Sequence, residues 1–234
     1  MKRVLFILLI TTLLCSCLPA AAQGATIYFN DTFEDEVTNA EPTSITVSGS
    51  ADVIVREYDT REKALFINKR ALTSAQLSAN VDSKTDSIVQ FDLMIKGAHS
   101  GSSLRFVNGS NKFTALNFGN NGELFTENGK KFASLPVGKW VTLAISYRKK
   151  VNCYDVYMDG KLVLSDWRLG NTSVSSISIL EMEFRASGSD SEIYLDNLRV
   201  YDGTQILPDS AFPRAAYNPQ AVEYVETVFE AGDS

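Results

Sequence analysis

The sequence predicts an all-β fold, a two-sheet antiparallel jelly-roll sandwich with a short C-terminal helix. Three observations predict it. Apolar and polar residues alternate in many short segments. Turn dipeptides separate these segments, the clearest being Asp159-Gly160, whose two residues readily take the positive φ angles of a type I′ hairpin. No segment with a helical period occurs before the last twenty residues.

The alternation indicates which face of each strand is buried. The predicted strands are 45–47, 53–55, 64–67, 88–95, 104–107, 113–118, 140–147, 154–158, 161–164, 177–184 and 193–201. The segment 180–184 is typical, because Leu180, Met182 and Phe184 share one face while Glu181 and Glu183 share the other. One apolar and one polar face per strand favour two antiparallel sheets that pack as a sandwich.

Residues 1–23 are predicted to be an export signal. Lys2 and Arg3 precede an apolar run, residues 4–14, which is too short to span a bilayer comfortably, and small residues follow at 20–22. A second interpretation stays open, since residues 14–17 resemble the lipobox of bacterial lipoproteins with Cys17 as the lipidated residue. Either interpretation takes the mature chain out of the cytoplasm, secreted or attached to a surface.

The composition excludes several classes of function. The chain has 22 basic and 28 acidic residues, one His and three Cys. Without the signal, 20 basic residues remain against 28 acidic ones, a net charge of −8. This balance argues against a nucleic-acid partner, which requires a clustered basic face. A single His leaves little room for a zinc site or a His-based relay. Only Cys153 remains, packed as a small residue in a strand, so an intramolecular disulfide is excluded.

The last 31 residues, 204–234, form an extension that differs from the sandwich at 24–203. It contains three prolines, and Asn218 followed by Pro219 has the pattern of a helix N-cap and first turn. Apolar residues at roughly helical spacing follow to Phe229. The predicted helix either docks on the sandwich or begins another domain of a longer protein. We expect a monomer.

Several stretches together carry a family resemblance. Residues 29–34 read Phe-Asn-Asp-Thr-Phe-Glu, residues 138–140 read Gly-Lys-Trp, residues 154–160 end in Asp-Gly, and residues 193–201 read Ile-Tyr-Leu-Asp-Asn-Leu-Arg-Val-Tyr. This pattern resembles the concanavalin A-like lectin/glucanase superfamily, in its laminin G-like and bacterial polysaccharide-utilisation branches, over about residues 25–203. The resemblance implies the sandwich fold. It does not select a function, because the superfamily includes lectins, hydrolases, lyases and adhesion modules.

A calcium site is predicted where the two ends of the sandwich meet. If the opening strand lies next to the final one, Asp31 and Glu34 approach Asp196, and three carboxylates with backbone carbonyls suit Ca²⁺. The resemblance also implies a structural calcium near this position. The alternative is that these acidic residues cap backbone amides in turns.

No catalytic residue is assigned from the sequence. Glucanases of the superfamily place E-x-D-x-E on one strand, and the nearest stretch here is Glu181 to Arg185. Glu181 and Glu183 share a face at about 7 Å, near the separation of paired catalytic carboxylates. However, Arg185 stands where the third acid belongs, which favours a solvated polar face on which Arg185 neutralises both acids. The lyase motifs Q-I-H and Y-x-K-x-G-x-Y are absent.

The candidates for a ligand-binding site are Trp167, Arg105, His99 and Arg185, because sugars are recognised by aromatic faces and planar polar groups. Trp167 could instead cover the rim of the core. The leading hypothesis is a non-catalytic carbohydrate-binding or surface-interaction module with a polysaccharide or glycan as its partner. The alternatives are a polysaccharide-active hydrolase or lyase, and a structural adhesion module without a sugar ligand.

Overall fold

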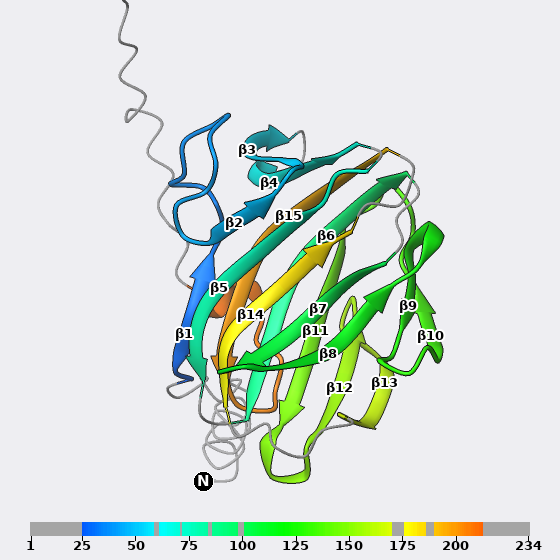
Figure 1. Cartoon of the computed structure of the whole chain (residues 1–234). Coiled ribbons are helices and arrows are strands. Elements are labelled where there is room, and N and C mark those ends of the chain that lie inside the picture. Colours follow the sequence, from blue (N-terminus) through cyan, green and yellow to red (C-terminus); the bar gives the residue numbers. More distant parts are fainter. Residues whose placement is uncertain are drawn as a thin grey trace, which may run out of the picture.

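Two antiparallel β-sheets packed face to face make up the fold (Figure 1). The computed structural model describes residues 25–58, 61–70, 72–83, 86–97, 101–169, 176–185 and 190–212. The predicted export signal with Cys17, the residue His99 and the predicted helix after Asn218 lie outside these residues.

The eight-stranded sheet is called sheet A and the seven-stranded one sheet B. In spatial order, sheet A contains β13 (Lys161–Arg168), β12 (Cys153–Met158), β11 (Val141–Arg148), β6 (Ser87–Gly97), β15 (Ser191–Asp202), β4 (Arg61–Lys69) and β3 (Asp52–Tyr58), with β1 (Ile27–Asp31) paired to β15. Sheet B contains β10 (Lys131–Ser134), β9 (Glu123–Phe125), β8 (Asn111–Phe118), β7 (Ser102–Asn108), β14 (Ile177–Phe184), β5 (Ala75–Ser83) and β2 (Thr46–Gly49). The described helices are 3-10 turns at Asn120–Gly122, Lys149–Val151 and Asp209–Ala211.

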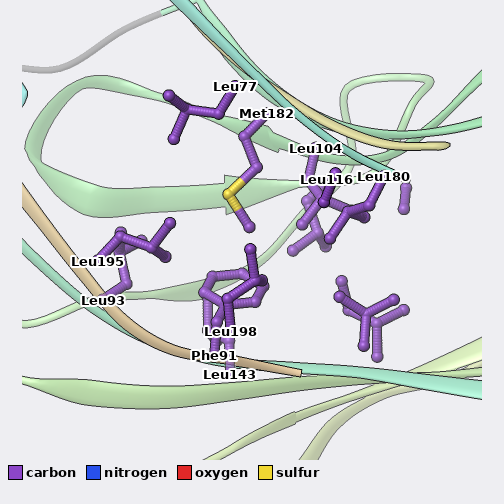
Figure 2. Close-up of a cluster of buried hydrophobic side chains, with 14 of the residues drawn as sticks. Leu77, Phe91, Leu93, Leu104, Leu116, Leu143, Leu180, Met182, Leu195 and Leu198 are labelled. Carbon is purple, nitrogen blue, oxygen red and sulfur yellow. The ribbon is translucent and has the colours of Figure 1, made fainter. Parts of the chain in front are cut away.

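The main core fills the space between the two sheets. Figure 2 shows leucines and a methionine of sheet B, among them Leu104 and Met182, pointing toward residues of sheet A, among them Phe91 and Leu195. These side chains come from alternate positions of their strands and are at most 5% exposed. The period-2 prediction of the buried faces is therefore confirmed, and the sandwich is held by apolar burial on both inner faces.

All of the predicted strands are present, and β1 lies beside β15 as expected, with Asp31 opposite Leu198. The strands β5, β9 and β10 are additional to those predicted from the sequence. In β5 the buried positions include Ala75 and Ala79, which are too small to make the alternation stand out. The strands β9 and β10 have three and four residues, too few for a period to be recognised.

Cys153 and Tyr147 both lie in the interior, which confirms the prediction made for Cys153. Cys153 is buried at the start of β12, and Tyr147 is 1% exposed in β11. Burial raises the pKa of Tyr147 to about 12, so its hydroxyl stays protonated and donates to Asn152 Oδ1 at 3.1 Å. Neither residue is accessible to a ligand on the surface.

The hairpin between β12 and β13 has the turn that its sequence predicts. Asp159 has φ of 48° and Gly160 has φ of 75°. We expect Gly160→Ala to lower the free energy of unfolding by about 1 kcal/mol, because alanine disfavours this left-handed backbone. No atom lies within 4 Å of the Cβ that alanine would add, so the backbone is the main source of the loss.

Urea unfolding of Gly160→Ala and Gly160→Asn measures this effect. Asparagine tolerates the left-handed region better than alanine does, so the asparagine variant should lose clearly less stability. Equal losses in the two variants would contradict the backbone explanation.

Residues 204–212 form a strap across the outer face of sheet A. Phe212 packs with Ile88, Ala144 and Tyr201 in a small apolar cluster separate from the main core. The Tyr201 hydroxyl accepts a hydrogen bond from the Leu207 N–H at 3.0 Å, which holds the strap from its backbone. The first part of the predicted extension therefore belongs to the packed structure.

The strap is also held by a buried charge. Arg199, in β15, is 1% exposed, and its Nη1 donates to Asp209 Oδ1 at 2.6 Å. Its guanidinium lies 4.4 Å from the centroid of the Phe212 ring. Arg199 also donates to Asn30 and Asn197, so sheet A and the strap share one polar network.

Candidate functional site

The outer face of sheet B carries two rows of polar side chains that cross the strands. They arise because alternate residues of β14, β7 and β5 point inward to the core and the residues between them point outward. The first row consists of Gln76, Glu183, Ser103 and Asn117, and the second of Ser78, Glu181, Arg105 and Thr114. We call these eight residues, with Lys112 and Arg185, the polar patch.

Arg105 is the centre of the polar patch. Its Nη1 donates to Glu181 Oε1 at 2.9 Å, and its Nη2 donates to the carboxylate of Glu183. The Arg105 and Glu181 side chains are 16% and 4% exposed. The register places Arg105 directly opposite Glu181, so its fork reaches both acids of the neighbouring strand. Charge-assisted hydrogen bonds of this kind are stronger than neutral ones and orient all three side chains.

Three more side chains complete the contacts of the two acids. Glu181 Oε2 accepts hydrogen bonds from Gln76 Nε2 at 3.0 Å and from Lys112 Nζ at 2.8 Å. Glu183 Oε1 accepts one from Arg185 Nε at 3.0 Å. Both carboxylates are therefore surrounded by donors.

The electrostatics of the patch keep Glu183 ionised. Burial alone raises the pKa of Glu183, but the hydrogen bond from Arg185 and the charges of Arg105 and Arg185 outweigh it, so this pKa lies below its usual range. A general acid needs the opposite shift. The arrangement is instead a set of fixed acceptors and planar donors, which suits recognition of hydroxyl groups.

Two of the four predicted binding residues, Arg105 and Arg185, meet in this patch, together with Glu181 and Glu183. One interpretation needs correction. Arg185 was expected to neutralise both acids, but it binds only Glu183, and Arg105 binds both. The physical reason is that β7 lies directly beside β14, so Arg105 is closer to Glu181 than an arginine four residues along the same strand.

Trp167 lies elsewhere, in the edge strand β13 of sheet A. It is partly buried against the main core, and Lys130 Nζ lies 5.2 Å from its ring centroid. This position agrees with a tryptophan that covers the rim of the core. The structure does not bring Trp167 together with the polar patch, since its strand belongs to the other sheet.

The three residues proposed as calcium ligands have protein partners. Asp31 accepts hydrogen bonds from the Phe33 N–H at 2.6 Å and from the Ser44 hydroxyl, and burial raises its pKa. Glu34 Oε1 accepts from the Lys63 N–H at 3.0 Å. Asp196 Oδ1 accepts from the N–H of the next residue at 2.6 Å.

In the part of the chain that the structure describes, no group of three or more Asp, Glu, His or Cys side chains could hold a metal ion. Calcium stays a prediction. If it is bound, excess EDTA lowers the melting temperature and added CaCl₂ restores it. A melting temperature that is the same with EDTA and with CaCl₂ would exclude a stabilising site.

Gln76, Ser103, Lys112 and Asn117 were not expected in the site. Gln76, Ser103 and Asn117 lie between buried neighbours on the outward face of their strands, and Lys112 precedes the buried Phe113. The alternation around Phe113 could have placed Lys112 on a polar face. What was missing was the order of the strands, because only the pairing of β5, β14, β7 and β8 brings these residues together.

No protein-family model and no curated protein matches this chain. Solved structures do match. A sialidase aligns with a TM-score of 0.60 and 16% identity over 78% of this chain and 19% of the sialidase. The cellulose induced protein Cip1 aligns with a TM-score of 0.56 and 10% identity over 74% of this chain and 96% of Cip1.

A carbohydrate esterase, vb_24B_21 from the Shiga toxin-encoding bacteriophage phi24B, aligns with a TM-score of 0.55 and 14% identity over 76% of this chain and 99% of the esterase. At these identities the similarities show the jelly-roll sandwich fold alone. The chain spans about a fifth of the length of the sialidase. Among the described residues, no helix is long and apolar enough to cross a membrane.

Proposed function

We propose that the chain is a non-catalytic carbohydrate-binding module of an exported bacterial protein, and that the polar patch on sheet B binds the glycan. The observation that carries this proposal is the Arg105 network, which holds two carboxylates and two guanidinium groups in fixed positions on the outer face of sheet B. Sugar hydroxyls are recognised by such pairs of planar donors and acceptors.

The dimensions of the patch favour an extended ligand. Its two rows cross β5, β14, β7 and β8, and neighbouring strands lie about 4.8 Å apart, so each row is about 15 Å long. Phe125 of β9 lies beside Asn117 at the end of the first row and adds a half-buried aromatic ring. This length suits several sugar residues in succession.

The structural neighbours support a sugar ligand as well. Several with a TM-score above 0.5 carry names that concern carbohydrates, among them the sialidase, the esterase and a protein described with endo-acting O-glycanases of the gut microbiota. Membership of the concanavalin A-like superfamily and export, by a cleaved signal or alternatively by a lipid anchor at Cys17, belong to the same proposal and rest on the sequence patterns described above.

The main alternative is a hydrolase that uses Glu181 and Glu183. Their shared face favours it, but hydrolysis requires one acid to be protonated, and Glu183 has a lowered pKa. The other alternative, an adhesion module without a sugar ligand, predicts that no glycan binds.

The experiment is a panel of soluble polysaccharides tested for binding by affinity electrophoresis and for release of reducing ends or unsaturated products. We expect binding without product release, and at least tenfold weaker binding for Glu183→Gln. Glu123→Gln is the matched control, because Glu123 is a half-buried acid of the same sheet that pairs with Lys131. Turnover that Glu183→Gln abolishes would establish the hydrolase instead, and a panel with no binding would favour the adhesion module.

A further inference from the structure

The charges of the polar patch are not balanced. Arg105, Arg185 and Lys112 bring three positive charges to the two negative charges of Glu181 and Glu183. This local positive surplus lies on a chain whose formal net charge is −6. A surplus of this sign on an acidic protein attracts an anionic group locally, although the chain as a whole repels polyanions.

The cations of the patch differ in how many of their nitrogens already donate hydrogen bonds to the two acids. Arg105 uses both terminal nitrogens on the two acids. Arg185 is 58% exposed and uses only Nε, on Glu183. Within the described part of the chain, its two terminal nitrogens make no hydrogen bond. They form a planar fork that matches two oxygens of a carboxylate or a sulfate.

A second observation points to the same place. Ser103 pairs directly with Glu183 in the register. It lies two residues before Arg105, on the same outward face of β7. It is 4% exposed, and its hydroxyl has no hydrogen-bond partner among the described residues. Buried hydroxyl groups in proteins are normally hydrogen-bonded, so an unpartnered one within a polar cluster indicates a ligand contact.

We propose that the glycan bound by the polar patch carries an anionic group, and that Arg185 receives this group with Ser103 as the accompanying donor. The proposal rests on the proposed function and specifies its ligand class. Lys112, which is half exposed at the opposite side of Glu181, adds a second positive charge for a ligand with repeated anionic groups. Carboxylate and sulfate share this chemistry, and the probes below separate them.

The test uses pairs of polymers that differ only in charge. Wild-type protein is titrated calorimetrically with polygalacturonate and with its methyl ester, and with dextran sulfate and dextran. We expect at least tenfold tighter binding to the anionic member of one pair, with an affinity that falls as salt is raised. The pair that shows the difference identifies the anionic group as carboxylate or sulfate.

Three variants assign the preference to the patch. Arg185→Gln should remove at least nine-tenths of it, Arg185→Lys should keep part of it, and Ser103→Ala should weaken anionic binding by a larger factor than neutral binding. Lys96→Gln is the control, since Lys96 is a partly exposed cation on the outer face of sheet A whose partner is Glu192. Circular dichroism and melting temperatures confirm that each variant is folded.

Each outcome decides between the two proposals. Equal affinity for the charged and neutral members leaves the proposed function standing and overturns the anionic ligand. A preference that Arg185→Gln and Lys96→Gln reduce equally also overturns it, because the patch would then play no special part. Binding to no polymer of any kind overturns both proposals.

Discussion

Phe212→Ala is expected to lower the free energy of unfolding by about 3 kcal/mol, at the lower end of the range for buried phenylalanines. Phe212 is 5% exposed, and its ring centroid lies 5.0 Å from that of Tyr201. The alanine would leave a cavity above sheet A and remove the ring that covers the buried guanidinium of Arg199. Within residues 204–212, Phe212 is the large apolar side chain that is buried, while the Arg199–Asp209 ion pair and the Leu207 N–H provide the polar attachments of the strap.

Urea unfolding followed by tryptophan fluorescence measures the loss. Leu162→Ala is the control, because Leu162 is a large apolar residue that is 53% exposed and should lose less than about 1 kcal/mol. The two variants differ mainly in whether the removed side chain is buried. Similar losses would show that residues 204–212 do not contribute to the stability of the sandwich.

The inward and outward faces of the strands could be predicted because alternation is a local property. Leu180, Met182 and Phe184 point to the core, and Glu181 and Glu183 point outward, as their spacing requires. The Asp159-Gly160 turn is equally local, since it depends on the conformational preferences of two adjacent residues.

The order of the strands could not be predicted from the same pattern. The pairing of β7 with β14 joins residues more than seventy positions apart, and no local signal specifies it. Arg105 was therefore expected only near a possible ligand, while the structure places it between two acids. Gln76 was missed for a related reason, because its strand β5 was not recognised.

The burial of Arg199 beneath the strap also could not be predicted from the sequence. Arg199 lies in a strand pattern that predicts a polar residue between apolar ones, which normally indicates an exposed side chain. It is instead fully buried, because residues 204–212 cover this part of sheet A and Asp209 provides its counter-charge. A segment outside the strands thus decides the burial of a residue within one.

Arg105→Gln is expected to be the most damaging single change in the polar patch, with a loss of about 3 kcal/mol at pH 7. Removing one partner of a buried ion pair is costly, and here the change removes the cation that both acids share while each acid keeps one other cation. Glu181 and Glu183 would face one another on the same side of β14 with only Lys112, Gln76 and Arg185 at their outer edges. The Glu183 side chain is 22% exposed, and this partial access to solvent keeps the loss at the lower end of the range.

The loss should depend on pH in a defined direction. In the wild-type protein the folded pKa of Glu183 lies below its ordinary value of 4.5, so this carboxylate stabilises the folded state above that pH. That stabilisation disappears as pH falls through the folded pKa. The difference between wild type and Arg105→Gln should therefore be largest near pH 7 and shrink below about pH 4.5, where protonation also relieves the repulsion in the variant.

The matched control is Arg148→Gln. Arg148 also donates to two acids, but only the Asp155 side chain is mostly buried, at 16% exposed, while the Asp166 side chain is 71% exposed. Exposed ion pairs contribute little, so this variant should lose clearly less stability than Arg105→Gln. Denaturation curves of both variants at pH 7 and pH 4 separate the two cases.

If Arg105→Gln lost no more stability than Arg148→Gln, or lost the same amount at both pH values, Arg105 would not be the residue that holds the two acids in place. The polar patch would then lack the rigid donor and acceptor geometry on which its proposed recognition of an anionic glycan depends.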